Sequence, residues 1–288
     1  MHLFVSSLGF GIIIAGVLLV ASVGFTLQYA ISGIFNLAYG AIMSVAMLVA
    51  YLCNNAGINI WLCVVIAAAA GGVLSVLLER GIIRPMLKRG ATSWAMMIVT
   101  FAVGIIVSAT ILATWGPGYS SYNLPGGNHN LGWLSFTTDQ FWIVVVAIVT
   151  AAAVWLLLHT TQLGRAMRGT AANVVLARSC GIRSERILTL TWLGSGVLCG
   201  AGGALLGVNV GSFTYITWEF FLPLIIAAAI VGGIGAPEGT MAGAVLIGVV
   251  SSVAVAYLTP TYQDVIALGI LVVAMLIRPR GLFARAGG

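Results

Sequence analysis

Apolar runs of about twenty residues follow one another along the chain, and short polar stretches separate them. Of the 288 residues, 61% are hydrophobic and 6% are charged, whereas a soluble domain carries about 25% charged residues. So few charged side chains cannot cover a surface that faces water. Because a crossing helix needs about 20 apolar residues, we predict an all-α integral membrane protein. It would be a bundle of about eight to ten transmembrane helices, forming a single domain over residues 1–288.

Nine crossings fit the pattern best, because turns or charged loops separate nine apolar runs. The second and seventh runs (residues 36–53 and 220–235) are short, and either could re-enter the membrane from one side instead of crossing it. Eight crossings is therefore the alternative count. The nine runs are Leu8–Ala30, Asn36–Cys53, Ile60–Ile83, Trp94–Trp115, Phe141–His159, Leu188–Val210, Phe220–Ile234, Thr240–Leu258 and Asp264–Ile277.

The twelve basic residues gather in three clusters, which follow the third, fifth and ninth runs. Even numbers of crossings separate the clusters, so all three fall on one side, and the positive-inside rule makes that side cytoplasmic. The C-terminus and the loop of residues 161–187 are then cytoplasmic. The N-terminus and the loop of residues 116–140, which has no Lys or Arg, are outside. The same rule accounts for the net charge of +6 without a nucleic-acid partner.

The loop of residues 161–187 is the most polar stretch and holds five of the twelve basic residues. Thr170 is predicted to N-cap a helix over Ala171–Cys180, with Gly181 after its C-terminus. Such a helix is too short to cross a membrane and marginal in water alone, so it needs a docking surface. Either the lipid surface or a groove on a soluble partner provides one.

Two sets of glycines recur at helical spacing. In the sixth run the steps of three and four place the glycines on one helical face, where another helix can approach closely. That helix belongs either to this subunit or to a second one. The first set is Gly196, Gly200, Gly203 and Gly207, and the second, at the start of the eighth run, is Gly235, Gly239 and Gly243.

Neutral polar residues lie beside the breaks in the hydrophobic pattern. A backbone break at membrane depth is tolerated only where protein or a water-filled cavity satisfies it. These side chains therefore either line a solute path or make structural hydrogen bonds at helix ends. They are Gln28, Asn36, Tyr39, Asn209, Ser212, Thr214 and Tyr215.

Signatures of enzymes and metal sites are absent from the sequence. The single lysine, Lys88, follows no P-loop, and no HExxH, GxSxG or CxxC motif occurs. We therefore expect no catalytic residue, metal or cofactor in this chain. The acidic residues all fall at predicted helix ends or in loops, which argues against a proton-coupled transporter, although Na⁺ coupling through backbone carbonyls escapes this test.

Four motifs in order resemble those of one family, the permease subunits of bacterial ABC importers of the branched-chain amino acid type, which also carry urea and short amides. The first is Asn36-Leu37-Ala38-Tyr39-Gly40, and the second is Gly164-Arg165-Ala166-Met167-Arg168 with Ala177 and Gly181-Ile182. The third is Gly232-Gly233-Ile234-Gly235 with Gly239 and Gly243, and the fourth is Arg278-Pro279-Arg280-Gly281-Leu282-Phe283.

The resemblance implies an importer of the bacterial inner membrane in which two permeases form the pore, the second usually a paralogue. Two cytoplasmic ATPases use ATP, and an extracytoplasmic binding protein delivers the solute. The helix of the 161–187 loop would be the coupling helix that docks on an ATPase. Its candidate residues are Arg165, Arg168, Ala171, Asn173, Val174, Val175, Arg178 and Gly181.

This chain also departs from the family pattern. Tyr39 and Ala41 stand where His or Gln and an acidic residue are usual, beside the expected pore, which leaves the solute open. Asn173, Arg178 and Cys180 change the coupling loop, and Glu238 adds a charge to the glycine run. The alternative function is an autonomous channel or secondary transporter for a small solute.

Overall fold

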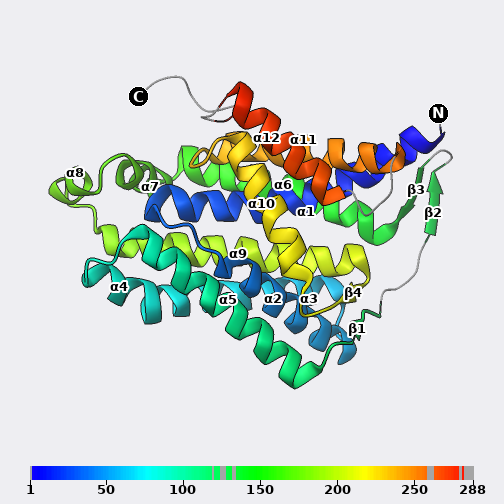
Figure 1. Cartoon of the computed structure of the whole chain (residues 1–288), viewed down its shortest axis with the longest axis horizontal. Helices are drawn as coiled ribbons and strands as arrows, with labels where there is room; N and C mark the ends of the chain where they lie inside the picture. Colours follow the sequence, from blue (N-terminus) through cyan, green and yellow to red (C-terminus); the bar gives the residue numbers. More distant parts are fainter. Residues whose placement is uncertain are drawn as a thin grey trace.

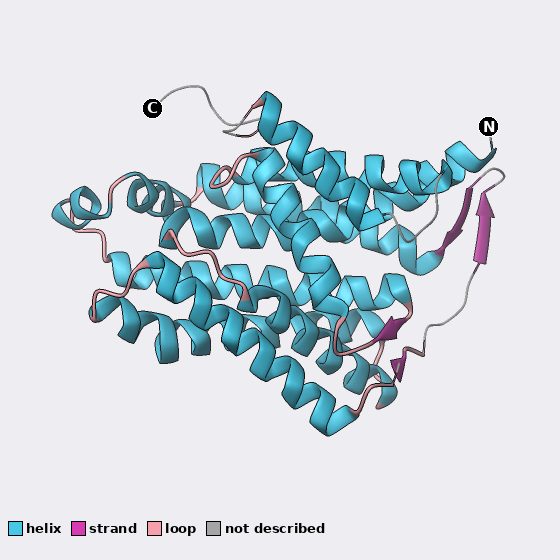
Figure 2. Ribbon diagram, viewed as in Figure 1, coloured by secondary structure: helices cyan, strands magenta, loops and turns pink. Residues whose placement is uncertain are grey.

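The computed structural model describes residues 2–118, 120–123, 128–131, 134–257, 263–278 and 281. Figures 1 and 2 show helices packed side by side, with short strands at one end. The helices are α1 (His2–Ser32), α2 (Ala38–Asn55), α3 (Ile60–Leu78), α4 (Arg84–Lys88), α5 (Ser93–Trp115), α6 (Thr138–Thr160), α7 (Gln162–Ala172), α8 (Val174–Ser179), α9 (Ser184–Val210), α10 (Thr217–Gly232), α11 (Pro237–Tyr257) and α12 (Gln263–Ile277). A π-helical turn, η1 (Glu79–Ile83), joins α3 to α4.

Seven helices of the described chain are long and apolar enough to cross a membrane, which confirms the prediction of an all-α membrane protein. They are α1, α2, the continuous helix from α3 to α4, α5, α6, α9 and α11. The shorter apolar helices α10 and α12, of 16 and 15 residues, coincide with the seventh and ninth predicted runs. The count of nine crossings stays a prediction.

The helix formed by the third run is longer than the sequence indicated. The charged residues after Glu79 were expected in a loop, yet the helix continues to Lys88. Pro85 has no N–H to donate to the carbonyl four residues earlier. The π-helical turn lies directly before it and absorbs this irregularity.

Helices α1 and α9 lie at the centre of the bundle and are mostly buried, whereas few residues of α5 and α6 are buried. The glycine face of α9 packs on other helices of the same chain. A side chain at Gly196 or Gly200 would strike the backbone of α3, and one at Gly203 would lie 2.5 Å from the Met43 carbonyl of α2. At Gly207 it would strike Tyr122. Close backbone contact therefore holds α9 against its neighbours.

The second glycine set joins α10 to α11. A side chain at Gly243 would lie 2.7 Å from the backbone nitrogen of Gly232, and one at Gly232 would strike the backbone of Gly239. Gly235 lies in the loop between the two helices with a φ of +88°, a conformation that glycine adopts without strain.

The two ends of the bundle differ in character (Figure 1). Helices α4, α7 and α8 and the C-terminal end of α12 lie at one end, which carries the described basic residues. The strands β1 (Ser120–Ser121), β2 (Asn128–Leu131), β3 (Leu134–Thr137) and β4 (Ser212–Phe213) lie at the other, with the N-terminus. β1 pairs with β4 and β2 with β3, both antiparallel. Arg280, Arg285 and most of the fourth motif lie outside the described residues.

Candidate functional site

Three of the polar residues predicted to line a solute path gather where α1 gives way to α2. Gln28, Asn36 and Tyr39 are each at most 1% exposed. The chain leaves α1 through Gly33, whose φ is +63°, and Asn36 Oδ1 accepts a hydrogen bond of 3.1 Å from Ala38 N at the start of α2. Tyr39 Oη donates to the Ala21 carbonyl at 2.7 Å. The break thus lies inside the bundle, and side chains satisfy part of its backbone.

Two amide groups of this inner group keep an unused donor. Gln28 Oε1 accepts from Ser195 Oγ of α9 at 2.9 Å, but Gln28 Nε2 and Asn36 Nδ2 have no partner among the described residues. A buried donor without an acceptor costs about 1–3 kcal/mol. An acceptor such as water or a solute carboxylate would remove that cost. Ser195 was missed by the sequence analysis, because nothing local indicates that it faces Gln28.

The other four predicted path residues lie near the opposite end, around the turn from α9 to α10. Asn209 and Thr214 line a cavity of about 310 Å³ between α1, α9 and α10, with apolar walls that include Phe220 and Phe221. Thr217 Oγ1 donates to the Thr214 carbonyl at 2.9 Å, which stabilises this turn. Ser212 instead pairs with Ser121 in the β1–β4 ladder, and Tyr215 packs partly buried against the main core. The structure therefore divides the predicted path residues into two separate groups.

The loop of residues 161–187 folds differently from the prediction. The helix expected over Ala171–Cys180 is replaced by α7 and α8, and Asn173, with φ −159° and ψ 108°, separates them. Asn173 Oδ1 accepts from Leu176 N at 3.0 Å and caps α8. Thr170 is not a cap, because it lies inside α7 and its hydroxyl donates to the Ala166 carbonyl. Asn is among the best N-cap residues, so the sequence did hold this signal. Gly181, with a φ of +82°, follows α8 as expected.

Helix α8 projects from the end of the bundle (Figure 1). Val174, Val175 and Leu176 are 39%, 74% and 63% exposed, whereas Ala177 is buried. Leu176 therefore shares the exposed surface of the two valines. Three adjacent exposed aliphatic side chains on a six-residue helix are unusual for a surface that faces only water.

Helix α7 anchors this projection. Met167 joins Leu27, Leu158 and Ile187 in a second apolar core, and Gly164 packs so closely on the α6 backbone that any side chain would strike the carbonyls of Leu157 and Leu158. Arg165, Arg168, Ala171 and Arg178 are exposed. The buried positions of α7 thus leave its basic face exposed.

A buried ion pair near this loop escaped the sequence analysis. Glu79 of η1 is 0% exposed, and Arg84 Nε donates to its Oε1 at 2.9 Å. Arg84 Nη2 also donates to Thr189 Oγ1 of α9 at 2.6 Å. The pair therefore links the end of α3 to the first turns of α9. The sequence placed Glu79 near the end of the third apolar run, and only the packing of α9 on α3 buries it.

Comparison with known proteins identifies the family to which this chain belongs. Residues 7–275 match the family described as the branched-chain amino acid transport system permease component. The chain belongs to this family. Membership confirms the sequence-based interpretation of a permease subunit of an ABC importer, a multi-pass membrane protein.

Relatives of this permease family match over nearly their whole length. The high-affinity branched-chain amino acid permease LivH of Salmonella typhimurium is 26% identical over 96% of this chain and 94% of its own. A probable LivH of Methanocaldococcus jannaschii is 28% identical over 94% of this chain and 90% of its own. The solved structure of PsaBC from Streptococcus pneumoniae in complex with Fab has a TM-score of 0.54 at 16% identity, covering 97% of this chain and 93% of that one. This last likeness shows the fold alone.

Proposed function

We propose that this permease carries branched-chain amino acids inward as one half of a pore, with a second permease, a paralogue, as the other half. Two cytoplasmic ATPases hydrolyse ATP, and an extracytoplasmic protein delivers the solute. The observation that carries the proposal is the match of residues 7–275 to the family. The names of the full-length relatives support the solute class.

The orientation follows from the distribution of charge. Helices α4, α7 and α8 gather basic residues at one end of the bundle, and basic loops face the cytoplasm. With α10 and α12 counted as crossings, the chain spans the inner membrane nine times as one domain. The N-terminus is then outside and the C-terminus cytoplasmic.

Helix α8 is the element that docks on an ATPase. Its exposed valines and Leu176 form an apolar knob, and the exposed Arg165, Arg168 and Arg178 add positive charge to this end of the bundle. An amphipathic helix that lies in a groove is a common mode of protein recognition. Because α7 anchors α8 to α6 and α9, a movement of the ATPase passes into the membrane helices.

The solute passes between the two groups of polar residues. The cavity beside Asn209 and Thr214 lies near the outer end, and the buried amides of Gln28 and Asn36 lie further in. The unused N–H groups of these amides provide donors for a carboxylate. Alternating access exposes these groups to one side at a time.

Reconstitution tests the proposal. The permease is placed in proteoliposomes alone, and together with its paralogue, ATPases and binding protein. Uptake of labelled leucine that requires ATP and every partner supports the proposal. Uptake by this chain alone, without ATP, would instead show a channel or secondary transporter. ATP hydrolysis stimulated by a different solute would show that the solute class is wrong.

A further inference from the structure

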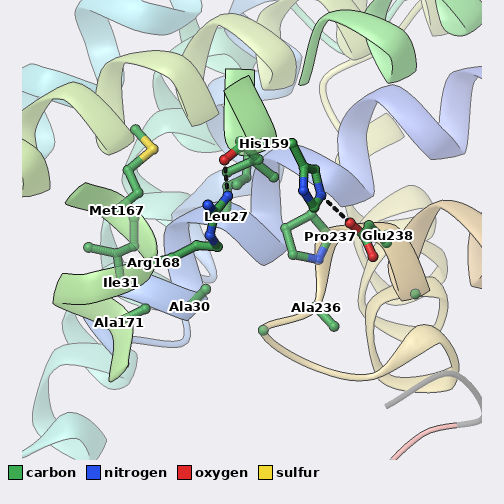
Figure 3. Close-up of a pocket in the computed structure, with 13 residues that line it drawn as sticks. Leu27, Ala30, Ile31, His159, Met167, Arg168, Ala171, Ala236, Pro237 and Glu238 are labelled. Carbon is green, nitrogen blue, oxygen red and sulfur yellow. Dashed lines mark hydrogen bonds and ion pairs between the residues drawn. The ribbon is translucent and has the colours of Figure 1, made fainter. Parts of the chain in front are cut away.

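A second pocket, of about 250 Å³, lies at the end of the bundle that carries the basic clusters. Three parts of the chain form it: the last turns of α1, the junction of α6 with α7, and the α10–α11 loop with the start of α11 (Figure 3). It lies at the opposite end of the bundle from the cavity beside Asn209. The solute path does not use it, and of the residues assigned to ATPase coupling only Arg168 and Ala171 line it.

The walls of this pocket are mostly aliphatic. Leu27, Ile31, Leu158 and Met167 provide the apolar surface, and Ala30 leaves space between them. Leu27, Leu158 and Met167 belong to the second apolar core, so their positions are fixed by packing. A branched aliphatic group is the moiety that such a surface buries favourably.

A positively charged and a negatively charged side chain lie on opposite sides of this apolar surface. Arg168 approaches from α7, and Glu238 approaches from the start of α11 (Figure 3). His159, at the end of α6, lies beside Glu238. Within the described part of the chain, these three are the ionisable residues that line the pocket.

Glu238 and Arg168 each have one partner in the pocket, and each keeps further hydrogen-bonding atoms. His159 Nε2 pairs with Glu238 Oε1, while the His159 ring stacks against Trp155 with centroids 5.0 Å apart. The Arg168 guanidinium donates to the Leu158 carbonyl through Nη1. A carboxylate has a second oxygen and a guanidinium has five N–H donors. The second Glu238 oxygen and the other Arg168 donors can therefore take a ligand while these bonds persist.

We infer that this pocket binds a free aliphatic amino acid from the cytoplasmic side. The α-ammonium group pairs with Glu238, the α-carboxylate pairs with Arg168, and the side chain contacts Leu27 and Ile31. Drug-sized ligands occupy pockets of about 300–1,000 Å³, so a cavity of about 250 Å³ suits a smaller molecule. The ligand class follows from this geometry, and its identity with the transported solute rests on the proposed function.

Binding here also has a consequence for transport. The ligand bridges Arg168 of α7 to Glu238 of α11, so it ties the segment that carries α8 to the rest of the bundle. A ligand stabilises the state to which it binds. Amino acid that accumulates inside the cell therefore holds α7 in place and slows further import.

Calorimetric titration with L-leucine tests the inference. The sample is the assembled permease–ATPase complex in nanodiscs, without the binding protein. Glu238→Gln removes the partner of the ammonium group, and Ala30→Phe fills the cavity without changing a charge. Glu238→Gln should weaken binding at least about tenfold, since a hydrogen bond to a charged group is worth that much. Ala30→Phe should weaken binding at least as much, because its ring occupies the space that the ligand needs. Glu185→Gln, which removes a negative charge from the same end of the molecule, should leave binding unchanged.

Two analogues distinguish a zwitterion site from a simple ion site. Isoamylamine lacks the carboxylate of leucine and 4-methylpentanoate lacks its ammonium group, so both should bind at least about tenfold more weakly than leucine. Equal binding of either analogue would overturn the inference. So would leucine binding that neither Glu238→Gln nor Ala30→Phe weakens, because the leucine would then occupy another site.

Proteoliposomes separate failure of this inference from failure of the proposed function. Leucine inside vesicles whose ATPases face the lumen should lower ATP-driven uptake, and Glu238→Gln should relieve that inhibition. An uptake rate that does not change with internal leucine would refute the inference but leave the importer function intact. Absence of leucine uptake at all external concentrations would instead refute the proposed solute.

Discussion

Glu79 and Arg84 form an ion pair across the π-helical turn between α3 and α4, with Glu79 Oε1 at 2.9 Å from Arg84 Nε. The carboxylate is fully buried, whereas a quarter of the Arg84 side chain remains exposed. Because Arg84 also donates to Thr189, this pair connects α3 to the start of α9. The connection lies next to the loop that we propose receives force from an ATPase.

Glu79→Gln should lower the stability of the permease by about 3 kcal/mol, because it removes the buried carboxylate that pairs with Arg84 and leaves only the exposed Glu185 carboxylate, 3.8 Å away. The double variant Glu79→Gln with Arg84→Met should recover part of that loss, since it removes both charges. Thermal unfolding of the purified complex measures the effect as a fall in Tm. An unchanged Tm in the single variant would mean that the pair contributes nothing.

Gly200→Ala should prevent tight packing of α9 on α3, because the added methyl group would lie 2.9 Å from the Ala68 Cα. Gly194→Ala, on the same helix, meets no atom within 4 Å. It should be neutral or stabilise by up to about 1 kcal/mol. The measurement is the yield of folded protein and its Tm. Equal behaviour of the two variants would contradict the packing described for α9.

Val175→Asp should reduce ATP-driven transport at least tenfold (about 1.4 kcal/mol) while membrane insertion and thermal stability stay unchanged. Val175 is 74% exposed on α8, so a carboxylate there disturbs the apolar docking surface and not the fold. Val175→Ile keeps the surface apolar and is the matched control. Solute-stimulated ATPase activity of the reconstituted complex gives the answer, and full activity in Val175→Asp would exclude α8 as the docking element.

Asn173→Ala should cost about 1 kcal/mol in α8 stability, because it removes the side chain that caps the helix. Asn173→Asp retains the cap and should behave like the original protein. Hydrogen exchange at the Leu176 amide reports the change directly. Unchanged protection of that amide in Asn173→Ala would show that the cap is unimportant.

Gln28→Met should lower transport about tenfold with little change in stability. It removes an amide whose Nε2 has no partner in the described chain, so the fold loses only the bond from Ser195. The net contribution of one hydrogen bond to stability is about 1 kcal/mol. Initial uptake rates and Tm are compared in the same preparation. A large fall in Tm without a specific loss of uptake would assign Gln28 a purely structural role.

Thiol labelling tests the orientation. Cys180 is an exposed free cysteine at the end of α8, whereas Ser121 is exposed in β1 at the opposite end. A membrane-impermeant maleimide should reach Cys180 only from the cytoplasmic side. In a Cys180→Ser background, Ser121→Cys should react only from outside. Labelling of both positions from one side would refute the nine-crossing arrangement.

The sequence predicted much of the architecture because membrane proteins obey strong local rules. Each crossing must be a long apolar segment, and the basic residues of the loops orient it. The starts and ends of most helices followed from these rules alone. The glycine spacing of α9 likewise indicated a close helix contact, although only the structure placed α3 and α2 of the same chain against it.

Tertiary structure decided the features that join distant segments. His159 and Glu238 are 79 residues apart and meet only because the end of α6 lies beside the start of α11. Glu79 becomes buried only because α9 packs over it, and Gln28 meets Ser195 across 167 residues. Local composition determines which segments enter the membrane, since each is solvated by lipid independently. Which side chains then face one another depends on how the helices pack, and that is a property of the whole chain.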